Sequence, residues 1–437
     1  MNQKKGVGQK EDLLLLEPKY FGPFWDYIQD DEITDVDFNG TDLWITDAQN
    51  RRTKIENHGI TKEFIEAFSQ RVSNQVSKEF NRNENLLEAE TETLRISILH
   101  ESAAVSGRSV CLRKSLPKVR MTAKGIVDQQ YMPRPLLNLL TNCIMSKMNM
   151  VVGGEPGAGK TESAKFFTQF IPDDQRVITI EDSPEWHYHT INPTHDCVEM
   201  RVNPQFSYAK AIKTCLRQNP KWIMLSEARS VEAKFLIEAW STGVNGVTTI
   251  HTDDIRKIAS RLLNMMGTRE DADRLENDIY DFVNVVFLVR RKAMPDGTAR
   301  RYIDQMGFFY RDEHRQNKVT MLVKNGEMIS DWLPPDIAFK LSWMGIDKPF
   351  ECEAIDHLIG DVFLYTPMPT AKPKLPEPEV SNIDPVKSKP EPVPTKSEPK
   401  KELDLNKKPR REAVKPQKRK PLPLGTLKFA ERKGDKA

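Results

Sequence analysis

The sequence predicts an α/β fold in which helices cover both faces of a parallel sheet. Four short apolar runs, at residues 148–153, 177–180, 222–225 and 247–250, suit strands that are buried on both faces. The stretches between them space their apolar residues as helices do. Each run is followed by glycines or by polar residues that can do chemistry. Because strand and helix alternate, the sheet should be parallel, and ligands should bind outside the carboxyl ends of its strands.

The first run leads into a complete phosphate-binding loop of the pattern G-x-x-x-x-G-K-[ST]. Glycines let backbone N–H groups surround the β- and γ-phosphates of a nucleotide, and the N-terminus of the following helix adds about half a positive charge. Lys160 would reach the same phosphates, and the Thr161 hydroxyl would complete the shell of a Mg²⁺ ion. The motif therefore predicts binding of ATP with Mg²⁺, the alternative being a glycine-rich turn. Its residues, with the first one after it, are Gly154, Glu155, Pro156, Gly157, Ala158, Gly159, Lys160, Thr161 and Glu162.

Polar residues follow the other three predicted strands. Glu227 comes two residues after the third run and could orient an attacking water and accept its proton, or else be a surface residue. His251 follows the fourth run and could sense the γ-phosphate, or else be an ordinary core histidine. The second run ends in acidic residues that would hold Mg²⁺ through water or shape the pocket, or else form a solvated turn: Glu181, Asp182 and Glu185.

Further motifs follow in a fixed order: Leu216-Arg217-Gln-Asn-Pro220, Ser226-Glu227-Ala-Arg229, Ser241-Thr-Gly243 and Thr249-Ile-His251-Thr. Together they resemble the type II/type IV secretion ATPases, closest to the conjugation/type IV secretion and tight-adherence pilus branches. These proteins are hexameric RecA-like motors. The resemblance covers roughly residues 20–300 and implies that Glu181 to Glu185 is the acidic box, Glu227 the Walker B glutamate and His251 the histidine box. It also brings Arg217 and Arg229 into the expected site.

The chain departs from the family pattern at three positions. The family usually has a second arginine before the proline and an aspartate after it, where this chain has Asn219 and Lys221. A glycine usually precedes the Walker B glutamate, where this chain has Ser226. None of these changes removes a group that could orient the attacking water.

The amino-terminal third resembles the N-terminal domain of the same family. Apolar residues at every fourth position predict one long amphipathic helix over residues 60–80. Residues 94–98 alternate as a half-buried strand with Arg95 on the other face, and residues 110–114 predict another strand that carries Arg113. The resemblance implies that both arginines lean over the nucleotide. The alternative is that both are surface arginines.

The last part of the chain changes in composition. From residue 366 onward lie 14 of the 29 prolines, and residues 371–437 hold 19 Lys/Arg against 10 Asp/Glu. This net charge of +9, within a chain total of +2, leaves the rest near −7. Too few large apolar residues remain to offset the entropy of ordering, so we expect a disordered tail. It would contact anionic lipid, nucleic acid or an acidic partner, or serve as a solvated linker.

These patterns predict a RecA-like P-loop NTPase domain with a smaller α/β N-terminal domain. The expected segments are a flexible N-terminus (1–17), the N-terminal α/β domain (18–118), a linker (119–132), the RecA-like ATPase domain (133–367) and a disordered basic Pro/Lys-rich tail (368–437).

Composition indicates a cytoplasmic protein on the inner face of the cell membrane. No apolar run approaches the roughly 18 residues that span a bilayer, and the start of the chain lacks the apolar core of a signal peptide. Five cysteines lie far apart with no C-x-x-C pair, which favours free thiols and argues against the zinc-containing branch of the family. The segment that holds His187, His189, His195 and Cys197 matches no standard zinc spacing, so we expect a polar loop there.

The expected function is that of a homohexameric, ATP-hydrolysing motor for type IV secretion or conjugative transfer, working with secretion components at the inner membrane. Assembly of type IV-like (tight-adherence) pili, with pilus components as partners, is the alternative within the family. Two other classes stay open at this stage, namely a DNA-acting ATPase and a non-hydrolysing scaffold. ATPase activity with and without DNA or lipid would separate them.

Overall fold

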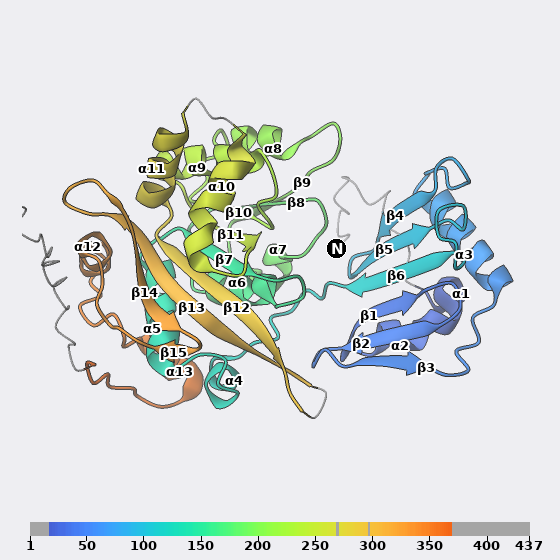
Figure 1. The fold of residues 1–437 in the computed structure, drawn as a ribbon, viewed down its shortest axis with the longest axis horizontal. Coiled ribbons are helices and arrows are strands. Elements are labelled where there is room, and N and C mark those ends of the chain that lie inside the picture. Colours follow the sequence, from blue (N-terminus) through green and yellow to red (C-terminus); the bar gives the residue numbers. More distant parts are fainter. Residues whose placement is uncertain (1–16, 268–270, 296–297, 369–437) are drawn as a thin grey trace, which may run out of the picture. The chain divides into compact units, whose positions relative to one another are not determined.

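The computed structural model describes residues 17–267, 271–295 and 298–368, and within them the chain forms two β-sheets (Figure 1). We call residues 18–114, around a six-stranded sheet, the amino-terminal lobe. Residues 123–360, around a nine-stranded sheet, are the P-loop lobe. The tail predicted from residue 368 lies outside the described residues except for its first position, as does the predicted flexible start up to residue 16.

In the amino-terminal lobe every pair of neighbouring strands is antiparallel, in the order β3-β2-β1-β6-β5-β4. Phe68 and Val72 on one face of α3 are buried in the same apolar cluster as Ile96 and Leu112 of the sheet. The elements are α1 (Pro18–Phe21), a 3-10 turn (Gly22–Phe24), α2 (Trp25–Gln29), β1 (Ile33–Phe38), β2 (Leu43–Asp47), β3 (Arg52–Ile55), α3 (Lys62–Gln75), β4 (Leu86–Glu90), β5 (Leu94–Leu99) and β6 (Ser109–Lys114).

The helix α3 is shorter than the sequence predicts, because local chemistry ends it at both sides. The hydroxyl of Thr61 accepts a hydrogen bond from the Phe64 N–H and caps the N-terminus. At the other end Ser77 has a φ of 52°, and the N–H of Lys78 bonds back to the carbonyl of Ser73. The prediction of one helix over residues 60–80 was therefore wrong at both ends, although the apolar face inside α3 was recognised.

The nine-stranded sheet has the order β15-β14-β13-β12-β7-β11-β10-β8-β9. From β12 to β9 all neighbours are parallel, whereas β13, β14 and β15 are added antiparallel. Its strands are β7 (Met150–Gly154), β8 (Val177–Glu181), β9 (Cys197–Arg201), β10 (Trp222–Leu225), β11 (Asn245–His251), β12 (Val285–Ala293), β13 (Ala299–Arg311), β14 (Asn317–Lys324) and β15 (Glu327–Met328).

Apolar side chains form a packed cluster on each face of the parallel strands. Val152 of β7 packs in the same cluster as Phe167 of α6, and the next residue along, Val151, packs with Leu236 of α9. The helices are α4 (Ala123–Asp128), α5 (Arg134–Met145), α6 (Lys160–Thr168), α7 (Tyr188–Ile191), α8 (Tyr208–Cys215), α9 (Glu232–Ser241), a 3-10 turn (Ile255–Lys257), α10 (Ile258–Met266), α11 (Ala272–Phe282), α12 (Pro335–Trp343) and α13 (Glu353–Ile359).

Two expectations for this lobe need correction. The sheet is only partly parallel, because the chain after β12 returns through a hairpin rather than a crossover helix. The segment expected to be a polar loop instead contains α7 and starts the edge strand β9 at Cys197. Trp186 and Tyr188, buried to 0% and 1% exposure, anchor this segment in the core.

The segment predicted as a linker, residues 119–132, contains α4, and much of it packs in the core of the P-loop lobe. Ala123 and Ile126 belong to the same apolar cluster as Val152 and Phe167. The hydroxyl of Tyr131 is hydrogen-bonded to that of Ser163 in α6, and its carbonyl accepts from the N–H of Ile303. Tyr131 therefore joins α6 to β13. Among the described residues, we find no helix with the length and apolarity to span a bilayer.

Candidate nucleotide site

The phosphate-binding loop follows β7, a central strand of the nine-stranded sheet. Gly154, Gly157 and Gly159 have φ angles of 155°, 73° and 97°, which residues with a side chain rarely adopt. A Cβ on Gly154 would lie 2.7 Å from the carbonyl oxygen of Val289. The helix α6 begins at Lys160 without a side-chain cap, so the N–H groups of its first turn remain available to an anion.

The parallel pairing of β7, β11, β10 and β8 brings their carboxyl ends to one edge of the sheet. His251 is the last residue of β11 and stands opposite Gly154 in the register. Glu181 ends β8, and Glu227 comes just after β10 ends at Leu225. The candidate residues from separate parts of the sequence are therefore neighbours of the loop.

Lys160, His251 and Glu227 form a continuous chain of polar contacts. Nζ of Lys160 lies 3.1 Å from Nδ1 of His251, and Nε2 of His251 lies 2.9 Å from Oε1 of Glu227. With Lys160 charged, Nδ1 must accept and Nε2 carries the proton that it donates to the carboxylate. Burial, opposed by the charges of Glu227 and Glu185, lowers the pKa of Lys160 to about 8.

The second oxygen of Glu227 is held by Arg229. Nη2 of Arg229 lies 3.1 Å from Oε2 of Glu227, and its Nη1 lies 2.9 Å from Oδ2 of Asp182. The Glu227 carboxylate is thus fixed through both oxygens, by an imidazole and a guanidinium. Asp182 is engaged in this ion pair and is not among the residues that line the cavity described below.

Glu181 is buried and supports the acidic segment from within. Its Oε1 accepts the N–H groups of Glu185 at 3.0 Å and of Trp186 at 2.9 Å. Burial raises the pKa of Glu181 to about 8, although both N–H donors act in the opposite direction. Its position indicates that it shapes the turn after β8.

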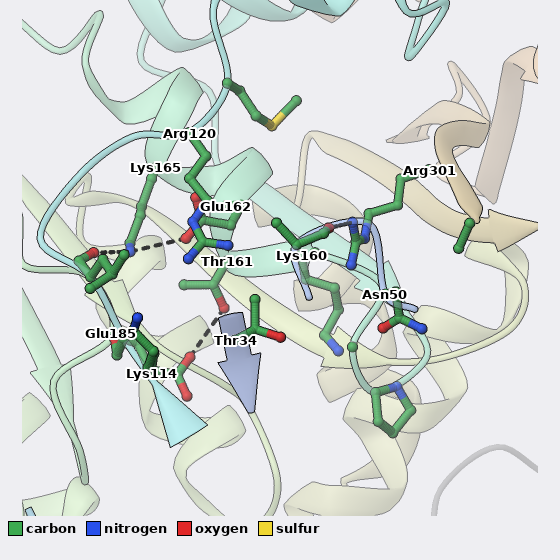
Figure 2. Close-up of a pocket in the computed structure, with 18 of the residues that line it drawn as sticks. Thr34, Asn50, Lys114, Arg120, Lys160, Thr161, Glu162, Lys165, Glu185 and Arg301 are labelled. Atoms are coloured by element: carbon green, nitrogen blue, oxygen red, sulfur yellow. Dashed lines mark hydrogen bonds and ion pairs between the residues drawn. The ribbon is translucent and has the colours of Figure 1, made fainter. Parts of the chain in front are cut away.

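Glu185 is the member of the acidic segment that reaches the phosphate loop. Its Oε2 accepts a hydrogen bond from the Thr161 hydroxyl at 3.1 Å (Figure 2). Its Oε1 accepts a hydrogen bond from Arg95 at 3.0 Å. Arg95 comes from β5, so one carboxylate joins the phosphate loop to the amino-terminal lobe.

Residues of both lobes line a cavity of about 740 Å³ around the phosphate loop (Figure 2). Its lining has an excess of five positive charges, which favours an anionic ligand. The cationic side chains are Arg95, Arg113, Lys114, Arg120, Lys160, Lys165, Arg229, Arg300 and Arg301, and the carboxylates are those of Asp35, Glu162, Glu185 and Glu227.

The two arginines predicted in the amino-terminal lobe both line this cavity. Arg95 and Arg113 stand directly opposite each other in the β5–β6 register. Arg113 is more than half exposed, and its Nε lies 3.8 Å from Oδ1 of Asp35 in β1. The Arg113 guanidinium thus lines the cavity, and its ion pair with Asp35 is a long one.

Arg217 lies away from the cavity. It follows α8 and precedes β10, which places it at the opposite edge of the sheet from Glu227, and its side chain is exposed. Nearby Asn219 has a φ of 51°, a conformation that asparagine adopts more readily than arginine. The role that the family resemblance implies for Arg217 therefore stays a prediction.

Several lining cations escaped the sequence prediction: Lys114, Arg120, Lys165, Arg300 and Arg301. Arg300 and Arg301 lie on β13, a strand that the sequence analysis did not identify. The only sequence signal for them was the dense run of basic residues on either side of the Pro-Asp-Gly sequence at 295–297.

A family model described as type II/IV secretion system protein matches residues 82–321. The chain belongs to this family. Its relatives include an uncharacterized protein of Bacillus anthracis (29% identity; 60% of this chain, 59% of the relative) and the type IV secretion system protein VirB11 of Brucella suis (32%; 38% and 48%). Another is the conjugal transfer protein TrbB of Rhizobium radiobacter (27%; 49% and 65%). The chain spans about half to two thirds of the length of these relatives.

Among solved structures, the chain is similar to the ATPase DotB of Yersinia pseudotuberculosis. The TM-score is 0.52 at 15% sequence identity, over 82% of this chain and 90% of DotB. At this identity the likeness shows the fold alone, an α/β fold shared with this ATPase.

In the present protein, the residues around the phosphate loop fit a nucleotide and its Mg²⁺ ion. The loop glycines leave room at the phosphate position, since a Cβ on Gly157 would meet no atom within 3.8 Å. The hydroxyl of Thr161 and the carboxylate of Glu185 face the same space, and hard oxygen donors are what Mg²⁺ prefers. Burial and the surrounding contacts hold the Lys160 ammonium in place to meet phosphate oxygens.

Proposed function

We propose that this chain is an ATP-hydrolysing motor subunit for type IV secretion or conjugative transfer. The observation that carries the proposal is the contact chain from Lys160 through His251 to Glu227 at the edge of the phosphate loop. It joins a phosphate-binding cation to a carboxylate that is held through both oxygens. Such an arrangement suits hydrolysis better than binding alone.

In this proposal Glu227 orients the attacking water and accepts its proton, because a carboxylate with fixed oxygens presents one lone pair in a defined direction. His251 holds Glu227 in place and contacts Lys160 through its other ring nitrogen. Arg113, whose guanidinium lines the cavity and makes only a 3.8 Å ion pair with Asp35, stabilises the charge that builds on the transferred phosphoryl group. Mg²⁺, held by Thr161 and phosphate oxygens with Glu185 or Asp182 through water, would neutralise phosphate charge.

The relatives favour secretion and conjugation as the process that is driven. VirB11 and TrbB are named for type IV secretion and conjugal transfer, whereas no observation favours pilus assembly over them. We propose that six copies form a ring at the inner face of the cell membrane, where hydrolysis energises components of the secretion machinery. The basic tail would strengthen attachment by contacting anionic lipid, or alternatively bind nucleic acid.

The full-length chain tests the function directly. Wild type should release phosphate from Mg²⁺–ATP, and Lys160→Ala should lose both fluorescent-nucleotide binding and hydrolysis, because the phosphates lose their fixed ammonium. Lys234→Ala, a partly exposed lysine on α9 that does not line the cavity, is the matched control. Nucleotide binding that survives Lys160→Ala would contradict the proposal. Strong stimulation by DNA would indicate a DNA-acting ATPase instead.

A further inference from the structure

The hairpin of β12 and β13 carries basic residues directly opposite one another. In its register Arg291 stands opposite Arg301, and Lys292 stands opposite Arg300. Like charges in this position destabilise a strand pair. Among the described residues Arg291 has no hydrogen-bond or ion-pair partner, so its charge is not compensated within that part of the chain.

This opposed pair lies beside the glycines of the phosphate loop. An ideal Cβ on Gly157 would be 3.9 Å from Nη1 of Arg291, and one on Gly159 would be 3.4 Å from Cδ of Arg301. Figure 2 shows the Arg301 side chain extending toward Lys160 and Asn50. The two guanidinium groups therefore approach the loop from the β12–β13 side, whereas Lys160 approaches from α6.

The Arg301 guanidinium does not use all of its hydrogen-bond donors within the described residues. Its Nη1 donates to the carbonyl oxygen of Ala48 at 2.9 Å, and its Nε is buried with no hydrogen-bond partner among the described residues. Burial lowers the pKa of Arg301, and the charges of Arg291 and Arg120 act in the same direction. A buried N–H without a partner is costly, so this donor is available to an acceptor that enters the cavity.

A phosphate chain is the ligand that fits these donors. A guanidinium is a planar fork that can bond two phosphate oxygens at once, and it keeps its charge when buried. An anion between Arg291 and Arg301 would also relieve their mutual repulsion.

We propose that Arg301, assisted by Arg291, binds the phosphate chain of the nucleotide from the β12–β13 side while still holding the carbonyl of Ala48. This inference rests on the proposed function. A second hydrogen bond, from the Ala299 N–H to the Gln49 carbonyl at 3.1 Å, fixes the same turn between β2 and β3. Arg301 thereby connects the bound nucleotide to the amino-terminal lobe.

Three charge-neutralising variants of the full-length chain test the proposal by competition of ATP and ADP against a fluorescent nucleotide. Arg301→Gln should weaken the affinity for both about tenfold or more, because it removes a charge-assisted hydrogen bond in a partly buried site. Arg291→Gln should weaken it only a few-fold, since its exposed charge is screened by salt. Lys292→Gln, on the same hairpin but not beside a glycine of the phosphate loop as Arg291 is, should leave it unchanged.

Thermal unfolding with and without ADP separates binding from folding. If Arg301 binds phosphate, Arg301→Gln should shrink the rise in Tm that ADP produces, whatever it does to the Tm of the free protein. Arg301→Lys should restore only part of that rise. An unchanged ADP-induced rise in Arg301→Gln, or equal losses in all three Gln variants, would overturn the inference.

Lys160→Ala tells this failure apart from failure of the proposed function. If Arg301→Gln keeps full nucleotide affinity and Lys160→Ala loses it, only the role of Arg301 is wrong. If both variants keep full nucleotide affinity, the nucleotide site itself is wrong.

Discussion

Nε2 of His251 lies 2.9 Å from Oε1 of Glu227, and this contact joins the ends of two adjacent parallel strands. The opposite ring nitrogen of the histidine meets Lys160. One side chain is therefore shared between the residue that would bind phosphate and the residue that would activate water. A phosphate bound by Lys160 would therefore be linked to Glu227 through a single side chain.

Glu227→Gln should separate nucleotide binding from hydrolysis. The amide keeps the size of the side chain but cannot accept a proton, so phosphate release should fall by a factor on the order of 10² or more while ATP still binds. Glu238→Gln, an exposed glutamate on α9, is the control with the same chemical change. Turnover near the wild-type rate in Glu227→Gln would mean that another carboxylate accepts the proton of the attacking water.

Nucleotide binding should take up a proton above pH 7.5. Burial lowers the pKa of Lys160 to about 8, so part of the population is neutral there, and a bound phosphate stabilises the ammonium. Affinity should therefore fall as the pH rises through 8, by at most about tenfold per pH unit. Calorimetry in two buffers of different ionisation enthalpy measures the uptake.

Lys160→Arg provides the control for this pH dependence. A guanidinium stays charged throughout the range, so the proton uptake should vanish even where binding is weaker. The assignment to Lys160 would be wrong if the arginine variant took up the same fraction of a proton.

Glu181 should make the protein less stable as the pH rises. Because its folded pKa is raised to about 8, the folded state keeps a proton that the unfolded state has lost above its ordinary pKa of 4.5. The free energy of unfolding should decline between these values, by up to about 1.4 kcal/mol per pH unit from this group. Glu181→Gln should flatten the decline.

Urea unfolding at several pH values from 5 to 8 measures that difference. Other titrating groups act equally in both proteins, so the comparison isolates Glu181. Parallel curves for the wild type and the Gln variant would show that this carboxyl is ionised in the folded protein.

Arg113→Ala should lower the turnover rate more than the affinity for ATP. Its fork has no close partner in the cavity, and a guanidinium can bond two oxygens where charge builds during transfer. Lysine should rescue poorly because it supplies a point charge. Arg52→Ala is the control. Arg52 is about as exposed as Arg113 and pairs with Asp37, but it does not line the cavity. Equal turnover in both variants would demote Arg113 to a surface residue.

The strands that carry the site were predictable because their signals are local. An apolar run followed by Glu181, Glu227 or His251 can be read in a few residues, and alternation with helices orders the parallel strands. The phosphate loop is likewise defined by adjacent residues. Parallel pairing then brings the ends together without further information.

The rest of the cavity depends on contacts between distant segments. Arg301 reaches the loop only because β13 pairs antiparallel with β12, and Arg291 faces it only in that register. A single sequence does not specify such a register. The early end of α3 was missed for the opposite reason, since the apolar spacing continues past Gln75 while the backbone at Ser77 turns away.

Tyr131 links the start of the P-loop lobe to the helix that carries Lys160. The segment before it is already held to this lobe, because Val119 and Met121 pack against its apolar cluster and the Ser115 hydroxyl donates to the carbonyl of Pro184. The hydroxyl of Tyr131 is bonded to that of Ser163 in α6, the helix that begins with Lys160. A shift of the phosphate loop on binding a ligand would therefore be transmitted through α6 to Tyr131, and a displacement of Tyr131 would be transmitted back to the loop.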